Sequence, residues 1–127
     1  KAPREKLLYT IAIYTGTGIQ KPDYLATIDV DPESQNYSQI IHRLEMPGIG
    51  DELHHMGWNA CSSCHGDEKM TRKYLLVPGV RSNNIYMLLI RQQTHTPLVY
   101  IRLLMVLKLN PKQICLVHTL SIVLDQK

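Results

Sequence analysis

YLATIDVDPESQNYSQIIHRL, residues 24–44, is the stretch that decides the fold. Over residues 24–30, apolar and β-branched residues alternate with other residues at a period of two, which is the pattern of a half-buried strand. The next four residues, Asp31-Pro32-Glu33-Ser34, have turn composition, because Pro presets a turn dihedral and Asp and Ser bond back to the main chain. β-Branched residues return over residues 37–44. The stretch therefore predicts two strands joined by a turn.

Three further segments have the composition of short strands. They are residues 7–14, 73–77 and 83–90, with Thr-Gly-Thr-Gly at 15–18 and Pro-Gly at 78–79 as turn signals. Short strands at even spacing, separated by Gly and Pro turns, are typical of a sandwich, a barrel or a propeller. The sequence has no strong helix signal before Met87. We therefore expect an all-β fold.

Length, charge and cysteine content bound the class of protein. The chain has 127 residues, enough for one ordinary domain. Its net charge of +3 is small and does not indicate a basic surface, so a nucleic-acid partner is not expected. It has no initiator methionine and no apolar run of the signal-peptide kind near Lys1, so we expect a fragment of a cytosolic protein. Two of the three cysteines stand three positions apart, as in intracellular thiol or metal motifs.

The composition changes abruptly after Tyr86. Up to that residue the chain has nine Lys and Arg, ten Asp and Glu, and all seven glycines, whereas residues 87–127 have five basic residues, one acidic residue and no glycine. Twenty of these forty-one positions are Leu, Ile, Val or Met. Residues 98–109 are too short and too charged a stretch for a membrane span and have the composition of a core helix or strand. We therefore divide the chain into residues 1–86, which carry the fold, and an atypical apolar C-terminal tail, residues 87–127.

The candidate chemistry is concentrated in residues 51–67, which read DELHHMGWNACSSCHGD. This stretch holds three of the six histidines, two of the three cysteines and the only tryptophan. Imidazole and thiolate are the side chains that bind soft or borderline metals and carry redox chemistry. Residues 46–67 are too rich in glycine and polar residues for a strand. We expect them to form a loop that carries the functional residues.

Three chemistries use such a pattern. Cys61-Ser62-Ser63-Cys64-His65 matches the C-x-x-C-H haem motif, but c-type cytochromes are mainly helical and mature outside the cytosol, so haem is disfavoured. A zinc site with Cys61, Cys64 and His54 or His55 has suitable donors, although only one C-x-x-C pair is present. Thioredoxin-type chemistry needs the pair at a helix N-terminus, and the sequence indicates no such helix.

A purely structural interpretation is the alternative. A C-x-x-C pair in a loop is often two small buried side chains, and adjacent histidines can satisfy hydrogen bonds around Trp58. The adjacent histidines, the thiol spacing and the carboxylates of Asp51 and Glu52, which suit acceptors for imidazole N–H groups, together favour a site. Elsewhere we expect a structural role for His42 and packing roles for Met46 and Met56.

Several of these motifs, taken in order, resemble the N-terminal region of the selenium-binding protein family, which is also known as methanethiol oxidase. They are PDYLATIDVDP at residues 22–32, IHRL at 41–44, DELHH at 51–55, GWN at 57–59 and CSSC at 61–64. The similarity spans residues 2–86, so it is far more specific than a lone C-x-x-C. The resemblance implies that the chain is the N-terminal part of a cytosolic β-propeller.

The same resemblance implies a function. Family members are implicated in copper-dependent oxidation of methanethiol, with O2 and water, to formaldehyde, hydrogen sulfide and hydrogen peroxide. The alternative is a non-catalytic selenium or metal binding protein with a role in intra-Golgi protein transport. The implied partners are small thiols or selenium species. The implied locations are the cytosol, the nucleus and the periphery of membranes, without an integral membrane span.

Two pairs of residues carry over from the family. His54 and His55 match its paired histidines, which are candidates for copper ligation, and Cys61 and Cys64 match its C-S-S-C motif, a candidate for selenium binding through polarizable thiolates. In mammalian relatives another cysteine, proposed for selenium attachment, falls where this chain has Ser38. This difference weakens any proposal that selenium is attached at position 38.

The tail shows no resemblance as written, but a shifted reading frame permits one. Codons that take the third base of one residue and the first two bases of the next permit VIDTATNPYAPSLHKVIDG from Met87 onward and PHTVHCLG over residues 117–124. At Met105, followed by Val106, the new codon must encode glycine. We hypothesise that residues 87–127 are a frameshift product and not a genuine domain. The family's later histidine segment is then out of frame, so we expect the chain to be inactive. An incomplete propeller also leaves sheet edges unpaired, so we expect the chain to aggregate.

Sequencing the corresponding nucleic acid tests the frameshift hypothesis. We expect an uninterrupted alternative frame from the codon of Met87 onward that encodes the permitted segments. Stop codons in that frame would reject the hypothesis.

Overall fold

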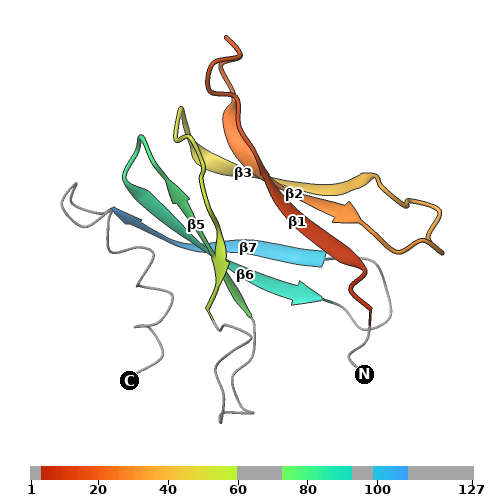
Figure 1. The fold of residues 1–127 in the computed structure, drawn as a ribbon. Coiled ribbons are helices and arrows are strands. Elements are labelled where there is room, and N and C mark those ends of the chain that lie inside the picture. Colours follow the sequence, from red (N-terminus) through yellow and green to blue (C-terminus); the bar gives the residue numbers. More distant parts are fainter. Residues whose placement is uncertain (1–3, 60–72, 93–98, 109–127) are drawn as a thin grey trace, which may run out of the picture. The chain divides into compact units, whose positions relative to one another are not determined.

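The structure, a computed structural model, describes residues 4–59, 73–92 and 99–108, and these form strands, turns and irregular segments. Contacts divide the chain into two compact units, Lys1–Leu53 and His54–Lys127. Each unit contains one antiparallel sheet, and Figure 1 colours the strands by their place in the chain. The predicted all-β class is confirmed. Within these described ranges no helix has the length and apolar character that crossing a membrane requires.

The first unit contains a three-stranded sheet in the order β1-β2-β3. The strands are β1 (Leu7–Ala12), β2 (Pro22–Asp29) and β3 (Ile40–Ile49). Because β2 lies in the middle and is extended, every second residue points to the same face of the sheet. The residues on one face, all buried, are Asp23, Leu25, Thr27 and Asp29. Two of these four are carboxylates, which can be buried only with hydrogen-bond partners.

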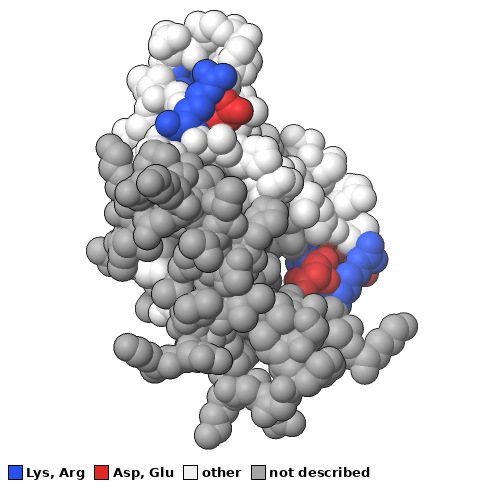
Figure 2. Space-filling view, turned by 60° about the vertical axis from the view of Figure 1, so that its left-hand side comes forward, with Lys and Arg blue, Asp and Glu red and all other residues white. Residues whose placement is uncertain are grey.

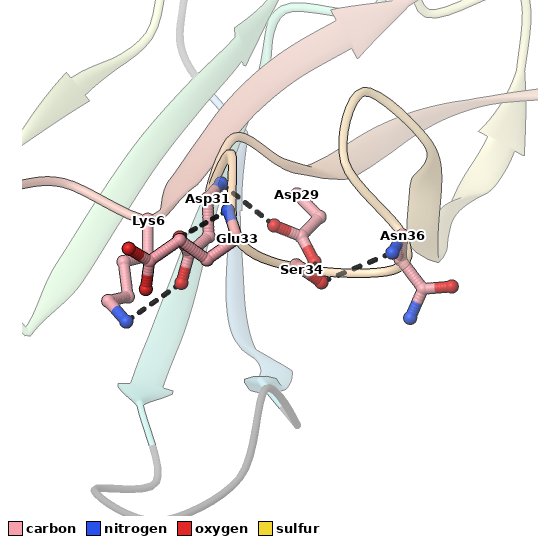
Figure 3. Close-up of polar contacts among 6 residues, drawn as sticks. All are labelled: Lys6, Asp29, Asp31, Glu33, Ser34 and Asn36. Atoms are coloured by element: carbon pink, nitrogen blue, oxygen red, sulfur yellow. Dashed lines mark hydrogen bonds and ion pairs between the residues drawn. The ribbon is translucent and has the colours of Figure 1, made fainter.

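Side-chain bonds to the main chain build the turn between β2 and β3 (Figure 3). Asp29 accepts the N–H of Asp31 on Oδ1 at 2.9 Å and the hydroxyl of Ser34 on Oδ2 at 2.6 Å. Asp31 Oδ1 accepts the N–H of Glu33 at 3.1 Å, and Ser34 Oγ accepts the N–H of Asn36 at 3.2 Å. The turn predicted from Asp-Pro-Glu-Ser is therefore confirmed, with the local bonding that these residue types favour.

The second unit contains a four-stranded sheet in the order β4-β5-β6-β7. The strands are β4 (Gly57–Trp58), β5 (Tyr74–Gly79), β6 (Asn84–Gln92) and β7 (Val99–Lys108). Its core is made by cross-strand pairs of β5 and β6, in which Leu75 lies opposite Leu88 and Val77 lies opposite Tyr86. All four side chains are buried. Such pairs are the unit that stabilises an antiparallel sheet.

The predicted strands are confirmed with shifted ends, but the loop predicted over residues 46–67 is partly wrong. β3 continues to Ile49, and Gly57–Trp58 forms β4. Pairing with strands that are distant in the sequence determines both the end of β3 and the formation of β4, because Ile49 lies opposite Pro22 of β2 and Gly57 lies opposite Leu76 of β5. Pro47 is tolerated within β3 because this strand is at the edge of its sheet.

Part of the apolar tail forms a strand. β7 pairs antiparallel with β6, from Lys108 opposite Asn84 to Val99 opposite Gln92. Of the two elements that the composition of residues 98–109 allows, helix or strand, the strand is observed. The change of reading frame after Tyr86 concerns the nucleic acid and stays a prediction.

An ion pair joins the segment before β1 to the turn after β2. Lys6 Nζ lies 2.7 Å from Asp31 Oδ2, and the two side chains are 60% and 20% exposed. The hydrogen bond from Lys6, and then the N–H of Glu33, lower the pKa of Asp31 below its ordinary value, while the hydrogen bond to Asp31 raises the pKa of Lys6. A lowered folded-state pKa means that the ionised carboxylate stabilises the fold. This contribution is present above the unfolded pKa and is lost as the pH falls through the folded pKa.

Asp31→Asn tests the ion pair. The amide keeps an oxygen that can accept the Glu33 N–H but has no charge, so we expect a slightly lower free energy of unfolding at neutral pH. The difference from the parent chain should narrow as the pH falls below about 4, the unfolded pKa of aspartate. Urea denaturation of the intact, full-length protein and of the variant made in it, at several pH values, measures this. Glu33→Gln, which removes a charge from the same turn without removing the Lys6 hydrogen bond, is the control, and a pH-independent difference for Asp31→Asn would contradict the expectation.

Candidate functional site

His54 and His55 lie between β3 and β4, directly after the buried Leu53. Both histidine side chains are exposed, and their rings meet edge to face, with centroids 4.2 Å apart and an interplanar angle of 82°. Imidazole can bind a metal through a ring nitrogen. The pair therefore brings two borderline donors together at one exposed place.

The main chain at the start of this pair is hydrogen-bonded. The N–H of Leu53 donates to Asp23 Oδ2 at 3.0 Å, and the N–H of His54 donates to the carbonyl of Pro78 in β5 at 2.8 Å. Leu53 is also 1% exposed, so its side chain is packed. The N–H groups directly before the pair and at its first residue are thus both hydrogen-bonded, each within its own unit.

Asp51 and Glu52, predicted to orient the imidazoles, differ in environment. Asp51 is buried, whereas Glu52 is half-buried and has a φ of 50°, in the left-handed region. The Asp51 carboxylate packs against the main chain of Gly48, where an added Cβ would lie 3.1 Å from each of its oxygens. A side chain at position 48 would therefore require the Asp51 carboxylate to shift by a few tenths of an ångström. The role of the two acids toward the imidazoles stays a prediction.

The described residues do not by themselves form a metal site. Within residues 4–59, 73–92 and 99–108 there is no group of three or more His, Cys, Asp or Glu side chains that could hold a metal ion. The two imidazoles fit copper or zinc by their donor chemistry, but such ions take about four ligands. A complete site that uses His54 and His55 therefore needs ligands from outside these ranges.

Cys61, Cys64 and His65 lie outside the described residues, so their roles stay predictions. The structure does describe the two points between which their segment runs. Asn59 Oδ1 accepts the N–H of Lys73 at 3.1 Å and that of Tyr74 at 3.0 Å, and the Asn59 N–H donates to the Tyr74 carbonyl at 2.9 Å. One asparagine therefore ties the residue before segment 60–72 to the two residues after it.

Sequence reasoning assigned no role to Asp23 or Asn59. Both act through hydrogen bonds to main-chain groups that are 9 to 30 positions away, and no local pattern reveals such a bond. The one available signal was an acidic residue at a position of β2 where the period-two pattern calls for an inward side chain. Among the residues given structural roles, Met46 is buried, and His42 and Met56 are half-buried.

The charged side chains drawn in Figure 2 form mixed groups, in which acidic atoms lie beside basic ones. On this face the described residues therefore present no extended patch of one sign, which is the feature that attracts a polyanion. The expectation that nucleic acid is not a partner stays a prediction.

Known proteins similar to this chain fall in one group. The profile described as 56 kDa selenium binding protein matches residues 1–123. Selenium-binding protein 1 of Arabidopsis thaliana is 58% identical over 98 residues, which cover 77% of this chain and 20% of the relative. A methanethiol oxidase of Xenopus laevis is 52% identical over 100 residues, which cover 79% of this chain and 21% of the relative. The chain thus spans about a fifth of the length of these relatives.

A solved structure is similar as well. The X-ray structure of a hypothetical selenium-binding protein from Sulfolobus tokodaii superposes with a TM-score of 0.73 at 44% identity, covering 85% of this chain and 24% of that one. The two antiparallel sheets of the present chain are consistent with part of a β-propeller, whose blades are antiparallel sheets of this size.

Asn59→Ala tests the tie across segment 60–72. The N–H groups of Lys73 and Tyr74 lose their acceptor, so we expect the free energy of unfolding to fall by about 1–2 kcal/mol. Asn59→Asp keeps an oxygen at the same place and should stay close to the parent chain. Urea denaturation of the intact, full-length protein and of the two variants made in it measures the difference. Equal losses in the two variants would show that the side-chain oxygen is not what stabilises this region.

Proposed function

Because this chain belongs to the 56 kDa selenium-binding protein family, we propose that the intact protein is a copper-dependent methanethiol oxidase. The proposed reaction converts methanethiol, O2 and water into formaldehyde, hydrogen sulfide and hydrogen peroxide, and it balances in every element. Relatives named methanethiol oxidase support this assignment. His54 and His55 would supply two of the copper ligands, and the substrate is a small thiol.

The observation that carries the proposal is the exposed histidine pair on its hydrogen-bonded main chain. The rings of His54 and His55 lie 4.2 Å apart, and the N–H groups of Leu53 and His54 are both bonded. Copper, when bound, supplies the redox chemistry toward O2 that side chains alone lack. The contribution of this chain is to hold the ion through imidazole nitrogens, which suit copper, and to restrict the directions from which they reach it.

A second candidate function is selenium binding without catalysis, with a role in intra-Golgi protein transport. Relatives named selenium-binding protein favour it. Cys61 and Cys64 would bind the selenium species, because thiolates are polarizable nucleophiles. The three hydrogen bonds between Asn59 and residues 73–74 also favour it, since they hold the chain at fixed points on both sides of the cysteines. For either function we propose a cytosolic protein, with nuclear and peripheral membrane pools.

Methanethiol consumption by the intact protein, with and without added copper, separates the two functions. An oxidase consumes methanethiol and needs the metal, whereas a selenium carrier does neither. In the oxidase, His54→Ala and His55→Ala should each lower copper affinity by about tenfold or more and lower turnover with it. His42→Gln, which removes an imidazole from β3, is the matched control and should leave both unchanged. Full turnover in the His54 and His55 variants would remove the site assignment.

A further inference from the structure

Two polar atoms on the buried face of the first sheet have no hydrogen-bond partner among the residues that the structure describes. They are Oγ1 of Thr27, on the central strand β2, and Nδ1 of His42, on β3, and both atoms are buried. Thr27 is 0% exposed, and His42 is half-buried. An unpaired buried polar atom costs free energy, so such atoms in folded proteins nearly always bond to a protein group or to an ordered water.

The strand register makes these two side chains neighbours. Thr27 lies directly opposite His42 in the antiparallel pair of β2 and β3. Directly opposite residues project from the same face of a sheet, with their β-carbons about 4.5–5.5 Å apart. The hydroxyl and the imidazole nitrogen nevertheless make no hydrogen bond to each other. The next opposite pair on the same face is Leu25 and Leu44, whose apolar side chains offer neither atom a partner.

The pair of Thr27 and His42 stands at an irregularity of the sheet. Ile28, the residue after Thr27, lies opposite Ile40, so between these two pairs β3 has one residue more than β2, namely Ile41. Such an extra residue interrupts the regular ladder of main-chain hydrogen bonds and bends its strand. A small third group is therefore accommodated here more easily than within a regular pair of strands.

We propose that one water molecule is bound between Thr27 Oγ1 and His42 Nδ1 as a fixed part of the first sheet. Water suits both atoms because it donates and accepts: a hydroxyl can do either, and an imidazole nitrogen accepts when it carries no proton and donates when it carries one. Two polar partners are the fewest that hold a buried water, and a water held in this way is costly to remove. The bound water joins β2 to β3 through side chains at the point where their main-chain ladder is irregular.

A crystal structure of the intact, full-length protein, at a resolution at which ordered waters are visible, tests this site directly. We expect one water whose oxygen lies about 2.5–3.2 Å from both Thr27 Oγ1 and His42 Nδ1. A direct hydrogen bond between the two side chains would overturn the proposal. The same holds if a protein group from elsewhere in the intact chain bonds to either atom in place of the water, or if no water lies between them.

The stability of Thr27→Val, made in the intact protein, is a second test, because the bound water decides the sign of the effect. Valine has the shape of threonine without the hydroxyl, and it is favoured in strands. Replacing a hydroxyl that has no partner removes an unpaired buried group, which should raise the urea midpoint of unfolding. Replacing a hydroxyl that binds a water shared with His42 leaves the water short of a partner, so we expect the midpoint to fall. A raised or unchanged midpoint would contradict the proposal.

Thr27→Ser is the matched variant, because serine keeps the hydroxyl at the same position of β2. The crystal structure of the Thr27→Ser protein should still contain the water, whereas that of the Thr27→Val protein should not. A water that stays in place beside His42 in Thr27→Val, or one that is lost from Thr27→Ser, would show that the threonine hydroxyl is not what binds it.

Discussion

A carboxylate taken out of water must have its oxygens hydrogen-bonded, because an unpaired buried charge costs several kcal/mol. In the first unit this requirement is met twice on one strand. Asp23 and Asp29 lie near opposite ends of β2, on the same buried face, and each accepts two hydrogen bonds. Their donors lie in the segments that follow β1, β2 and β3. The central strand therefore fixes the conformation of the loops at both of its ends as well as the register of its neighbours.

In the second unit, main-chain groups and the side-chain amide of Asn59 hold the segments next to the sheet by hydrogen bonds. The apolar pairs of β5 and β6 make the core, and the Pro78 carbonyl, in the same strand β5, accepts the N–H of His54. β4 is only two residues long, yet Asn59 directly after it bonds to Lys73 and Tyr74 at the start of β5. His54, the first residue of the histidine pair, thus bonds to β5 through its own N–H, and Asn59, two residues before Cys61, bonds to the start of β5 and to the residue before it. A rigid sheet next to variable loops is the usual way in which binding residues are presented.

The parts of the fold that local patterns control were predictable from the sequence. Period-two alternation in β2 and β5 and the turn chemistry of Asp31 to Ser34 gave elements that the structure contains. The end of β3 and the whole of β4 were not predictable, because Pro47, Gly48 and Gly57 lower strand propensity and only pairing with distant strands compensates. Composition and spacing identified His54 and His55 as candidates. Asp23 and Asn59 were missed because their partners are far away in the sequence.

The contact between Gly48 and Asp51 has an evolutionary consequence. A methyl group at position 48 would lie 3.1 Å from each oxygen of the buried Asp51 carboxylate, so the acid would have to shift by a few tenths of an ångström to admit it. A side chain at position 48 is therefore accommodated most easily when residue 51 is shorter or turned away. Positions 48 and 51 are therefore expected to change together in evolution, and homologues that lack the acid at position 51 are those that can also lack the glycine at position 48.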